Sequence, residues 1–469
     1  MHNKVVRKNS RSRIEDMIQT LREEIASGKH PVGDCLPSES DLEKRFRLGN
    51  NSVRKGLDIL VQEGLIVKIP RVGNKVLGLP SEGRQVIKLG VYNTTDNETD
   101  LSGLLEQFHR LHPQLLVQTI TIPTNSYAGY IQEQMNAGLL DAVTMNYNTF
   151  RELSAGTKEE LLEPMDSSPD YYPFTTEPFM DGGKLLVKPI MFSPLVLCYN
   201  LDHLREGNLP EPESGWSWDK LLWLAEQLSV ENKRFGFCFH LLSRNRWPVF
   251  LFQSGIRFEP DDDGEYRLPV DRLTECLDVC RKLINRPDVF PTMLSGRDGT
   301  TVEWFLDGKV SMIMTTYFAM NRLKEAGFSF DLAPLPALRE NRTMLTIIGV
   351  SVNRKSAVKD AARLLADYLG SREAQTLIRQ NTFSIPSHRA AAEWQGEKMQ
   401  GKRPHRFDLF REIIATFRLL EHLPVTNREL FAMQKEVELY WTGLQDGEAV
   451  SRGIGRALRE ANRSAKQDQ

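Results

Sequence analysis

The chain has 469 residues, of which 40% are hydrophobic and 26% charged, values ordinary for a globular protein that can build a large core. Its formal net charge is −2, and no run of about 18 apolar residues predicts a membrane span. The N-terminus lacks the apolar segment of a signal peptide. We therefore expect a cytoplasmic protein of roughly two to four domains with no membrane partner.

The five cysteines and nine histidines predict neither a disulfide framework nor a metal site. Cys276 and Cys280 are one helical turn apart, but no second pair accompanies them, and His109 and His112 have no third ligand in view. Buried thiols are the favoured interpretation. No Ser/His/Asp, Cys/His or paired-carboxylate constellation stands out. We predict no metal, no cofactor and no catalytic residue.

The first predicted elements are two helices. Apolar side chains at helical spacing over residues 14–25 give one stripe that would face a core. Glycine and proline then predict a turn. Ser38, followed by Asp41 three residues later, is a capping-box arrangement that predicts a short helix to about Arg47.

A third helix and a hairpin complete a helix-turn-helix with a wing. The helix is expected to be capped by Asn51 or Ser52 and to stop at Gly64, and the alternation over residues 65–78 predicts the hairpin. In helix-turn-helix proteins, the N-terminal end of the second helix of the turn contacts base edges and phosphates. The candidate DNA-contacting residues are Ser38, Asn50, Asn51, Ser52, Arg54, Lys55, Arg71 and Gly73.

The charge distribution supports contact with nucleic acid by this segment only. Residues 1–80 carry 15 Lys and Arg against 10 Asp and Glu, a net charge of +5, so the remaining residues carry −7. A basic head on an acidic body fits DNA binding through the head. The simpler alternative is a small helical domain with a solvated basic face, but the caps, turn, apolar stripe and wing all agree with the DNA-binding interpretation.

Three motifs stand in this segment: Leu36-Pro37-Ser38-Glu39, Val53-Arg54 and Glu63-Gly64-Leu65-Ile66. With them, residues 12–77 resemble the GntR family of bacterial winged-helix transcription regulators. The resemblance implies that Arg54 contacts bases and phosphates and that Ser52 contacts the phosphate backbone. The chain departs from the family pattern at Gly49-Asn50, where Ser or Thr followed by Arg is usual, and at Arg71 and Gly73, where paired glycines are usual. These departures leave the operator sequence open.

Beyond this segment the pattern changes. Turn-forming residues at 79–85 predict a linker between a DNA-binding domain of residues 1–78 and a larger domain of residues 86–469. Strands and helices alternate from residue 86 onward, which is typical of an α/β fold.

The larger domain contains a series of landmarks in order: His112-Pro113-Gln114, Asp181-Gly182-Gly183-Lys184, Tyr199-Asn200-Leu201-Asp202, Trp216-Ser217-Trp218-Asp219 and Phe305-Leu306-Asp307-Gly308-Lys309. In these landmarks it resembles the extracellular solute-binding proteins of bacterial transporters, in particular those serving sugars and oligosaccharides. The resemblance implies a type 2 periplasmic-binding-protein fold with two α/β lobes that close on a ligand. Lobe I would comprise about 86–196 plus a segment after about 345, and lobe II about 197–344, with helices at the C-terminus.

Ligands of open α/β sheets bind beyond the carboxyl ends of the strands. A sugar needs hydrogen-bonding groups for its hydroxyls and an aromatic face for its C–H side. Trp247 and Tyr147 have core packing as an alternative, and Asp96 has the alternative of closing a turn. The candidates that follow predicted strands or lie in polar loops are Asn93, Thr94, Asp96, Asn146, Tyr147, Asn148, Ser193, Trp247 and Tyr317.

The leading functional hypothesis is a ligand-responsive transcription regulator, in which a sugar changes the geometry of a homodimer on operator DNA. An alternative is a GntR-type head on an aminotransferase-like body that binds pyridoxal phosphate. That body needs a Schiff-base lysine in a recognisable context, which Lys355 lacks. A third possibility is a solute-binding body that carries the head without sensing.

Overall fold

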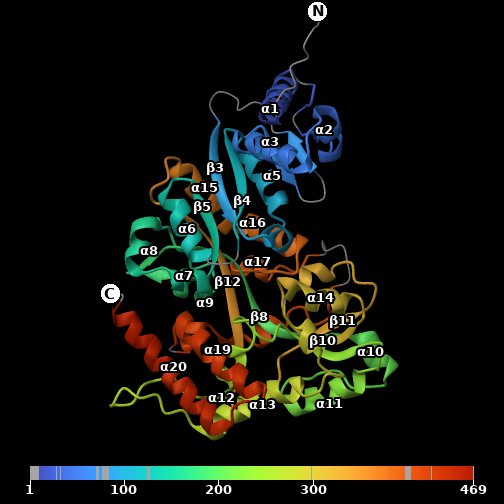
Figure 1. Cartoon of the computed structure of the whole chain (residues 1–469), viewed down its shortest axis with the longest axis vertical. Helices are drawn as coiled ribbons and strands as arrows, with labels where there is room; N and C mark the ends of the chain where they lie inside the picture. The colour runs from blue at the N-terminus through green and yellow to red at the C-terminus, as the bar shows by residue number, and fades with distance from the viewer. Residues whose placement is uncertain are drawn as a thin grey trace, which may run out of the picture.

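The computed structural model describes residues 10–27, 29–31, 33–69, 73–76, 84–123, 127–296, 298–396, 403–423 and 425–467. A small N-terminal head, residues 10–76, lies at one end of a larger body (Figure 1). Arg71 and residues 79–83 of the expected linker lie outside the described residues. Within the described ranges, the helices are too short or too polar to span a lipid bilayer.

The head is a winged helix-turn-helix, as the sequence predicts. Ser38 accepts a hydrogen bond from the backbone N–H of Asp41 at 3.2 Å and so caps the second helix as expected. The third helix begins at Asn50, with Gly49 as its N-cap and no capping side chain. The predicted cap at Asn51 or Ser52 is wrong because the extended backbone already ends at Gly49. The elements are α1 (Ser10–Ala26), α2 (Glu39–Phe46), α3 (Asn50–Gln62), β1 (Ile66–Ile69) and β2 (Gly73–Val76).

Close packing of α1 against α3 builds the core of the head. A Cβ atom on Gly56 of α3 would lie 2.2 Å from Cε of Met17, so the end of the Met17 side chain would have to move to admit a larger residue. The predicted apolar stripe of α1 is buried against Val53, Leu57 and Leu60 of α3. Burial of these side chains is the main source of the stability of the head.

Lobe I of the body contains a sheet covered by helices on its faces (Figure 1). β3 lies between β4 and β5 and is parallel to both, and β4 is at the edge. The strands are β3 (Gln85–Val91), β4 (Leu115–Thr121), β5 (Ala142–Asn146) and β13 (Ile385–Pro386). The helices include α4 (Thr95–Thr99), α5 (Leu101–Leu111), α6 (Tyr127–Asn136), α7 (Tyr147–Glu152), α8 (Ala155–Leu161), α9 (Pro173–Thr176), α15 (Lys359–Gly370), α16 (Arg372–Asn381) and α17 (Arg389–Ala392).

Two long strands, β8 (Lys188–Asn200) and β12 (Thr343–Val352), run from one lobe into the other (Figure 1). β8 pairs with β12 up to Pro194 and with strands of lobe II from Leu195 onward. The pairing of β8 with β12 has an irregularity between Ile348 and Gly349. A Cβ on Gly349 would lie 2.5 Å from the carbonyl oxygen of Lys188, so glycine is required where the two crossing strands bend.

Lobe II combines a second group of strands with the C-terminal helices. α19 begins with a capping box between Thr426 and Glu429. It packs on α13, where Trp441 donates through Nε1 to the carbonyl oxygen of Leu277 at 3.0 Å. The strands are β9 (Phe235–Cys238), β10 (Val310–Thr316), β11 (Phe330–Ala333) and β14 (Phe417–Arg418). The helices include α10 (Leu201–Glu206), α11 (Trp218–Leu228), α12 (Pro248–Ser254), α13 (Val270–Ile284), α14 (Asp298–Leu306), α18 (Leu409–Glu412), α19 (Asn427–Trp441) and α20 (Gly447–Gln467).

Candidate functional site: the recognition helix and the interlobe cleft

The predicted DNA-contacting residues of α3 lie at its exposed N-terminal end. Asn50, Asn51, Arg54 and Lys55 are exposed, and Ser52 is partly buried. The helix N-terminus also offers backbone N–H groups and a positive dipole end, both of which favour phosphate. The structure therefore places these five residues on one accessible surface.

Two carboxylates of α2 hold part of this surface in place. Arg54 donates through Nε to Oε2 of Glu39 at 2.8 Å. Asn50 donates through Nδ2 to Oε1 of Glu43 at 2.6 Å. Hydrogen bonding to Glu39 raises the pKa of Arg54, so this guanidinium is a permanent cation. A phosphate or base that binds Arg54 must compete with Glu39, which orients the arginine before DNA arrives.

Ser38 and Gly73 both line one hollow of about 410 Å³ beside the wing, which Glu39 also lines. The hydroxyl of Ser38 already has two partners, because it caps α2 and also donates to Oδ2 of Asp41 at 2.6 Å. Gly73 is exposed with φ 121°. The hollow connects the wing to the recognition helix through Glu39. Arg71 cannot be placed, since it lies outside the described residues.

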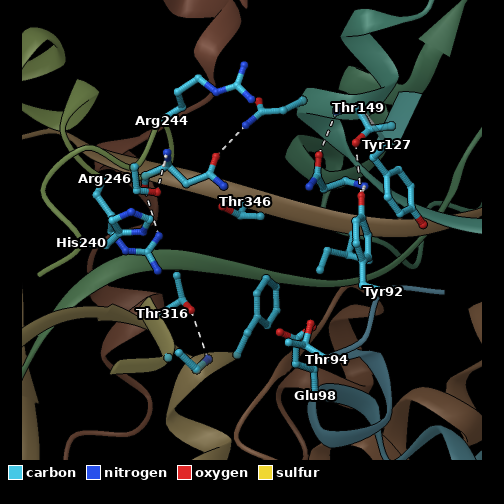
Figure 2. Close-up of a pocket in the computed structure, with 18 of the residues that line it drawn as sticks. Tyr92, Thr94, Glu98, Tyr127, Thr149, His240, Arg244, Arg246, Thr316 and Thr346 are labelled. Carbon is cyan, nitrogen blue, oxygen red and sulfur yellow. Dashed lines mark hydrogen bonds between the residues drawn. The ribbon is translucent and has the colours of Figure 1, made fainter. Parts of the chain in front are cut away.

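A second site is a cleft of about 960 Å³ formed by lobe I, lobe II and the C-terminal helices (Figure 2). Its volume falls in the range of ordinary ligand pockets. The crossing strand β12 contributes Thr346 and Ile348 to its floor. Movement of either lobe about the crossing strands would therefore change the shape of the cleft.

The lobe I wall presents an aromatic pair beside amide and hydroxyl groups. The rings of Tyr92 and Tyr127 stack with centroids 4.2 Å apart and an angle of 19° between their planes. Tyr92 exchanges a hydrogen bond of 3.2 Å with Thr149, and its hydroxyl accepts another from the backbone N–H of Asn146. Burial raises the pKa of Tyr92 to about 12, so its hydroxyl remains neutral. Figure 2 shows this group on one side of the cavity.

The lobe II wall carries charged and polar side chains from the loop before α12. Asn245 accepts a hydrogen bond of 2.7 Å from Nδ2 of Asn148, so this contact joins the two lobes across the cleft. Arg244 lies 4.0 Å from the carboxylate of Glu152 on lobe I. Figure 2 shows Arg244 and Arg246 on the same side of the cavity, opposite Tyr92. These side chains can donate hydrogen bonds to ligand hydroxyls.

The third wall comes from the C-terminal helix α19. Phe431 lines the cleft with 68% of its surface exposed. Asn427, at the start of the helix, donates through Nδ2 to Oε1 of Glu152 at 2.7 Å. An aromatic ring left open to solvent in a cleft is the kind of flat apolar face on which the C–H side of a sugar can stack.

Glu98 is a partly buried carboxyl at the lobe I end of the cleft, next to Thr94 in Figure 2. Burial raises its pKa to about 7, an effect opposed by a hydrogen bond from Thr94. Near neutral pH a large fraction of Glu98 is therefore protonated and can donate as well as accept a hydrogen bond.

The structure brings four of the nine predicted ligand contacts to the cleft: Asn93, Thr94, Asn146 and Asn148. The other five, Asp96, Tyr147, Ser193, Trp247 and Tyr317, are not part of its wall. Asp96 accepts a hydrogen bond from the backbone N–H of Ser102 at 2.8 Å, so it closes a turn. Tyr147 is buried and donates to Glu421.

The remaining three are fully buried. Trp247 packs edge-on against Trp441 with centroids 6.3 Å apart, inside the core of lobe II. Ser193 accepts a 2.9 Å hydrogen bond from the backbone N–H of Tyr317. Tyr317 in turn donates to the carbonyl oxygen of Phe407 at 2.9 Å. Trp247 was expected in a polar loop, but it stands at the start of α12 and its ring turns inward.

Three features of the cleft were missed by reasoning from the sequence. The cleft wall includes Thr316 and Tyr92, which stand next to the proposed Tyr317 and Asn93 in the sequence. Asn93 also lines the cleft, whereas Tyr317 is buried. The polar neighbours of Trp247 were also overlooked, since Arg244, Asn245 and Arg246 face the cavity. No local signal marks Phe431, because only the tertiary packing of α19 brings it to the cleft.

The chain belongs to the family of bacterial extracellular solute-binding proteins, whose family model matches residues 103–404, and residues 13–76 match that of the bacterial regulatory proteins of the gntR family. Both are non-enzymatic families. The body has the fold of solute-binding proteins and not that of the aminotransferase-like alternative.

Among curated proteins, the galactooligosaccharide-binding protein of Bacillus subtilis is 22% identical over 252 residues, which is 51% of this chain and 58% of that protein. The chain thus spans less than two thirds of the length of this relative. Among solved structures, an ABC substrate-binding protein from Listeria monocytogenes in complex with cycloalternan has a TM-score of 0.68 at 19% identity. The match covers 82% of this chain and 99% of that one.

The maltotriose-binding protein of Thermus thermophilus, solved with maltotriose, has a TM-score of 0.65 at 19% identity and covers 80% of this chain and 99% of its own. At these identities the solved structures establish the fold of the body. The structure therefore joins a GntR-type winged helix to a two-lobed body of the solute-binding type.

Proposed function

We propose that this protein is a sugar-responsive bacterial transcription regulator. Its winged helix binds operator DNA, and the cleft of its body binds an oligosaccharide that changes how well the DNA is bound. The observation that carries the proposal is the presence, in one chain, of an exposed recognition helix and a cleft lined by amides, hydroxyls and aromatic rings.

The chemistry of the cleft supports a carbohydrate ligand. Amide groups of Asn93, Asn146 and Asn148 can each donate and accept, as sugar hydroxyls require. Phe431 offers an open aromatic face on the opposite side. The relatives whose names mention galactooligosaccharide and maltotriose favour an oligosaccharide over a monosaccharide.

The surface of the head supports binding to double-stranded DNA. Arg54 and Lys55 are exposed at the N-terminal end of α3, where a recognition helix meets base edges. Ser52, at the same end of the helix, offers its hydroxyl to a phosphate. The body, with its net charge of −7 outside residues 1–80, should be repelled by DNA.

The proposed mechanism requires two heads. We propose a cytoplasmic homodimer in which ligand brings the lobes together and changes the spacing of the two recognition helices. Half-sites read from one face of DNA are about 34–36 Å apart, so a small rotation of the heads matters. Ligand shifts DNA affinity only through its different affinity for the two arrangements, a coupling that is commonly about 5- to 150-fold.

The test uses the full chain and two measurements. Calorimetric titration with maltotriose and with a galactooligosaccharide should show binding by at least one of them, with glycerol as the negative control. Gel-shift titration with DNA from upstream of the protein's own gene should show specific binding that changes when the ligand is added. Specific DNA binding that never responds to any bound sugar would overturn sensing, and lack of specific DNA binding would overturn regulation.

A further inference from the structure

The head contacts lobe I through the C-terminal end of the recognition helix α3. Gln118, on the edge strand β4, donates through Nε2 to the carbonyl oxygen of Val61 at 2.8 Å. The same oxygen accepts the backbone N–H of Gly64 at 3.0 Å. The last four carbonyl groups of a helix lack partners inside the helix, and here a side chain of the body supplies a further donor to one of them.

An apolar contact lies beside this hydrogen bond. Gly64 ends α3 with φ 71°, and a Cβ atom built on it would lie 3.9 Å from Cδ2 of Leu116, an ordinary van der Waals distance. Leu116 is buried although it lies on an edge strand. The contact therefore combines a directional bond from Gln118 with apolar packing by Leu116, two residues apart on the same face of β4.

The two ends of α3 have different tasks. The candidate DNA contacts, from Asn50 to Lys55, occupy the N-terminal end, while Val61 stands in the last turn. A helix of 13 residues is about 20 Å long and behaves as a stiff rod over that length. A rotation imposed at Val61 is therefore delivered to the DNA-contacting end.

On the body side, the same ladder of strands leads to the cleft. β4 pairs with β3 in register over seven residues, and Gln118 lies opposite Lys88. β3 ends at Val91, directly before Tyr92 in the cleft wall. Tyr92 is four residues beyond Lys88, about 13 Å along the strand. The ligand site and the contact with the head thus lie at two points on one pair of strands.

We propose that Gln118 is the positioning residue that fixes the recognition helix on lobe I, so that lobe rotation on ligand binding moves the head as one unit with that lobe. This inference rests on the proposed function and names its route of regulation. A covalent connection alone keeps a head near its body but leaves its orientation free. The contact at Val61 restricts the orientation, and a coupling free energy requires such a defined difference between the two states.

The docking can be tested without ligand or DNA. Cys35 in the head is exposed, and the other four cysteines are buried, so Cys35 accepts a nitroxide label. A second label goes on Leu139→Cys in lobe I, where the native side chain is 48% exposed. Pulsed electron resonance should give one narrow distribution of the distance between the two labels. Gln118→Ala and Gln118→Glu should each broaden that distribution.

The Gln118 variants should still fold, because the carbonyl of Val61 keeps the N–H of Gly64 as a donor. The matched control is Gln132→Ala, which removes another lobe I glutamine whose Nε2 lies 3.4 Å from Oγ1 of Thr157. Its distance distribution should remain narrow. A broad distribution in the labelled parent, or a narrow one in both Gln118 variants, overturns the docking.

The regulatory part is measured as a ratio of two DNA dissociation constants, with and without a saturating concentration of the oligosaccharide, maltotriose or galactooligosaccharide, that the parent binds in calorimetry. The parent and Gln132→Ala should share the same ratio, whereas Gln118→Ala should bring it close to one with the affinity for that oligosaccharide unchanged. An unchanged ratio in Gln118→Ala overturns the inference even if the proposed function holds. A ratio of one in the parent overturns the proposed function and this route of regulation together, while the label distances still report the docking separately.

Discussion

Replacing Phe431 by alanine separates ligand binding from folding. The ring lines the cleft and is 68% exposed, so it contributes little to the core. Exposed side chains away from caps and cores change stability by about 0.5 kcal/mol or less. We therefore expect the free energy of unfolding of Phe431→Ala to match that of the parent within about 0.5 kcal/mol.

The expected loss of ligand affinity follows from the exposed area of the ring. An aromatic side chain offers ~150–250 Å², so 68% of it leaves ~100–170 Å² accessible in the cleft. A sugar stacked on one face covers about half, ~50–85 Å², which at ~25 cal/mol/Å² stabilises the complex by ~1.3–2.1 kcal/mol. Phe431→Ala should then weaken binding about tenfold to thirtyfold.

The assay is calorimetric titration with the oligosaccharide that the parent binds, together with urea denaturation of each variant. Leu444→Ala is the control, because Leu444 is also an exposed apolar side chain (75%) and does not line the cleft. Leu444→Ala should change neither the affinity for the oligosaccharide nor the free energy of unfolding. Full affinity in Phe431→Ala would refute the assignment of the third wall, and a large loss of stability would show that the ring is a packing residue.

Three further outcomes are expected. Arg54→Ala should weaken operator binding by about 1–3 kcal/mol in a gel-shift titration, whereas Arg205→Ala, which removes an exposed charge from lobe II, should not; equal effects would remove Arg54 from the DNA surface. Trp247→Ala should cost about 3–5 kcal/mol of stability by urea denaturation and leave the ligand affinity of the folded protein unchanged, because the ring is buried; the reverse pattern would return Trp247 to the ligand site. Burial raises the pKa of Glu98 from 4.5, its value in the unfolded chain, to about 7 in the folded protein. The neutral carboxyl therefore contributes its full stabilisation below pH 4.5, and this contribution is lost as the pH rises through 7. The free energy of unfolding of Glu98→Gln relative to that of the parent should therefore rise by roughly 2 kcal/mol between pH 5 and pH 8. A difference that does not change with pH would mean that Glu98 is already ionised in the folded state.

The elements of the head were predictable because local chemistry determines them. Ser38 caps a helix through an atom three residues away, and Gly64 ends one through its own backbone. The N-cap of α3 at Gly49 was not predicted, because it depends on backbone angles that several consecutive polar residues can adopt equally well. The order of strands and helices in the body followed in the same way from short-range patterns.

The cleft was only partly predictable. Asn93 and Asn146 were found because they directly follow strands whose carboxyl ends meet at one edge of a sheet. Trp247 and Phe431 show the limit of that reasoning: one aromatic in a polar stretch turns into the core, and another on an ordinary amphipathic helix turns out to the cleft. Which side of a helix faces a ligand depends on packing against residues far away in sequence, and the sequence pattern of α19 alone does not contain that information.

The contribution of α19 to the cleft, apart from the core of the head, has a genetic consequence. The head keeps its own core from Met17 to Val76, while the cleft is complete only when Phe431 is in place. A missense change at Phe431, on the cleft side of α19, should therefore leave a product that retains the proposed operator-contacting surface but responds more weakly to sugar. In a cell that also makes the intact protein, such a product would compete for the same operators. Its phenotype should therefore be dominant, whereas a simple loss of function is recessive.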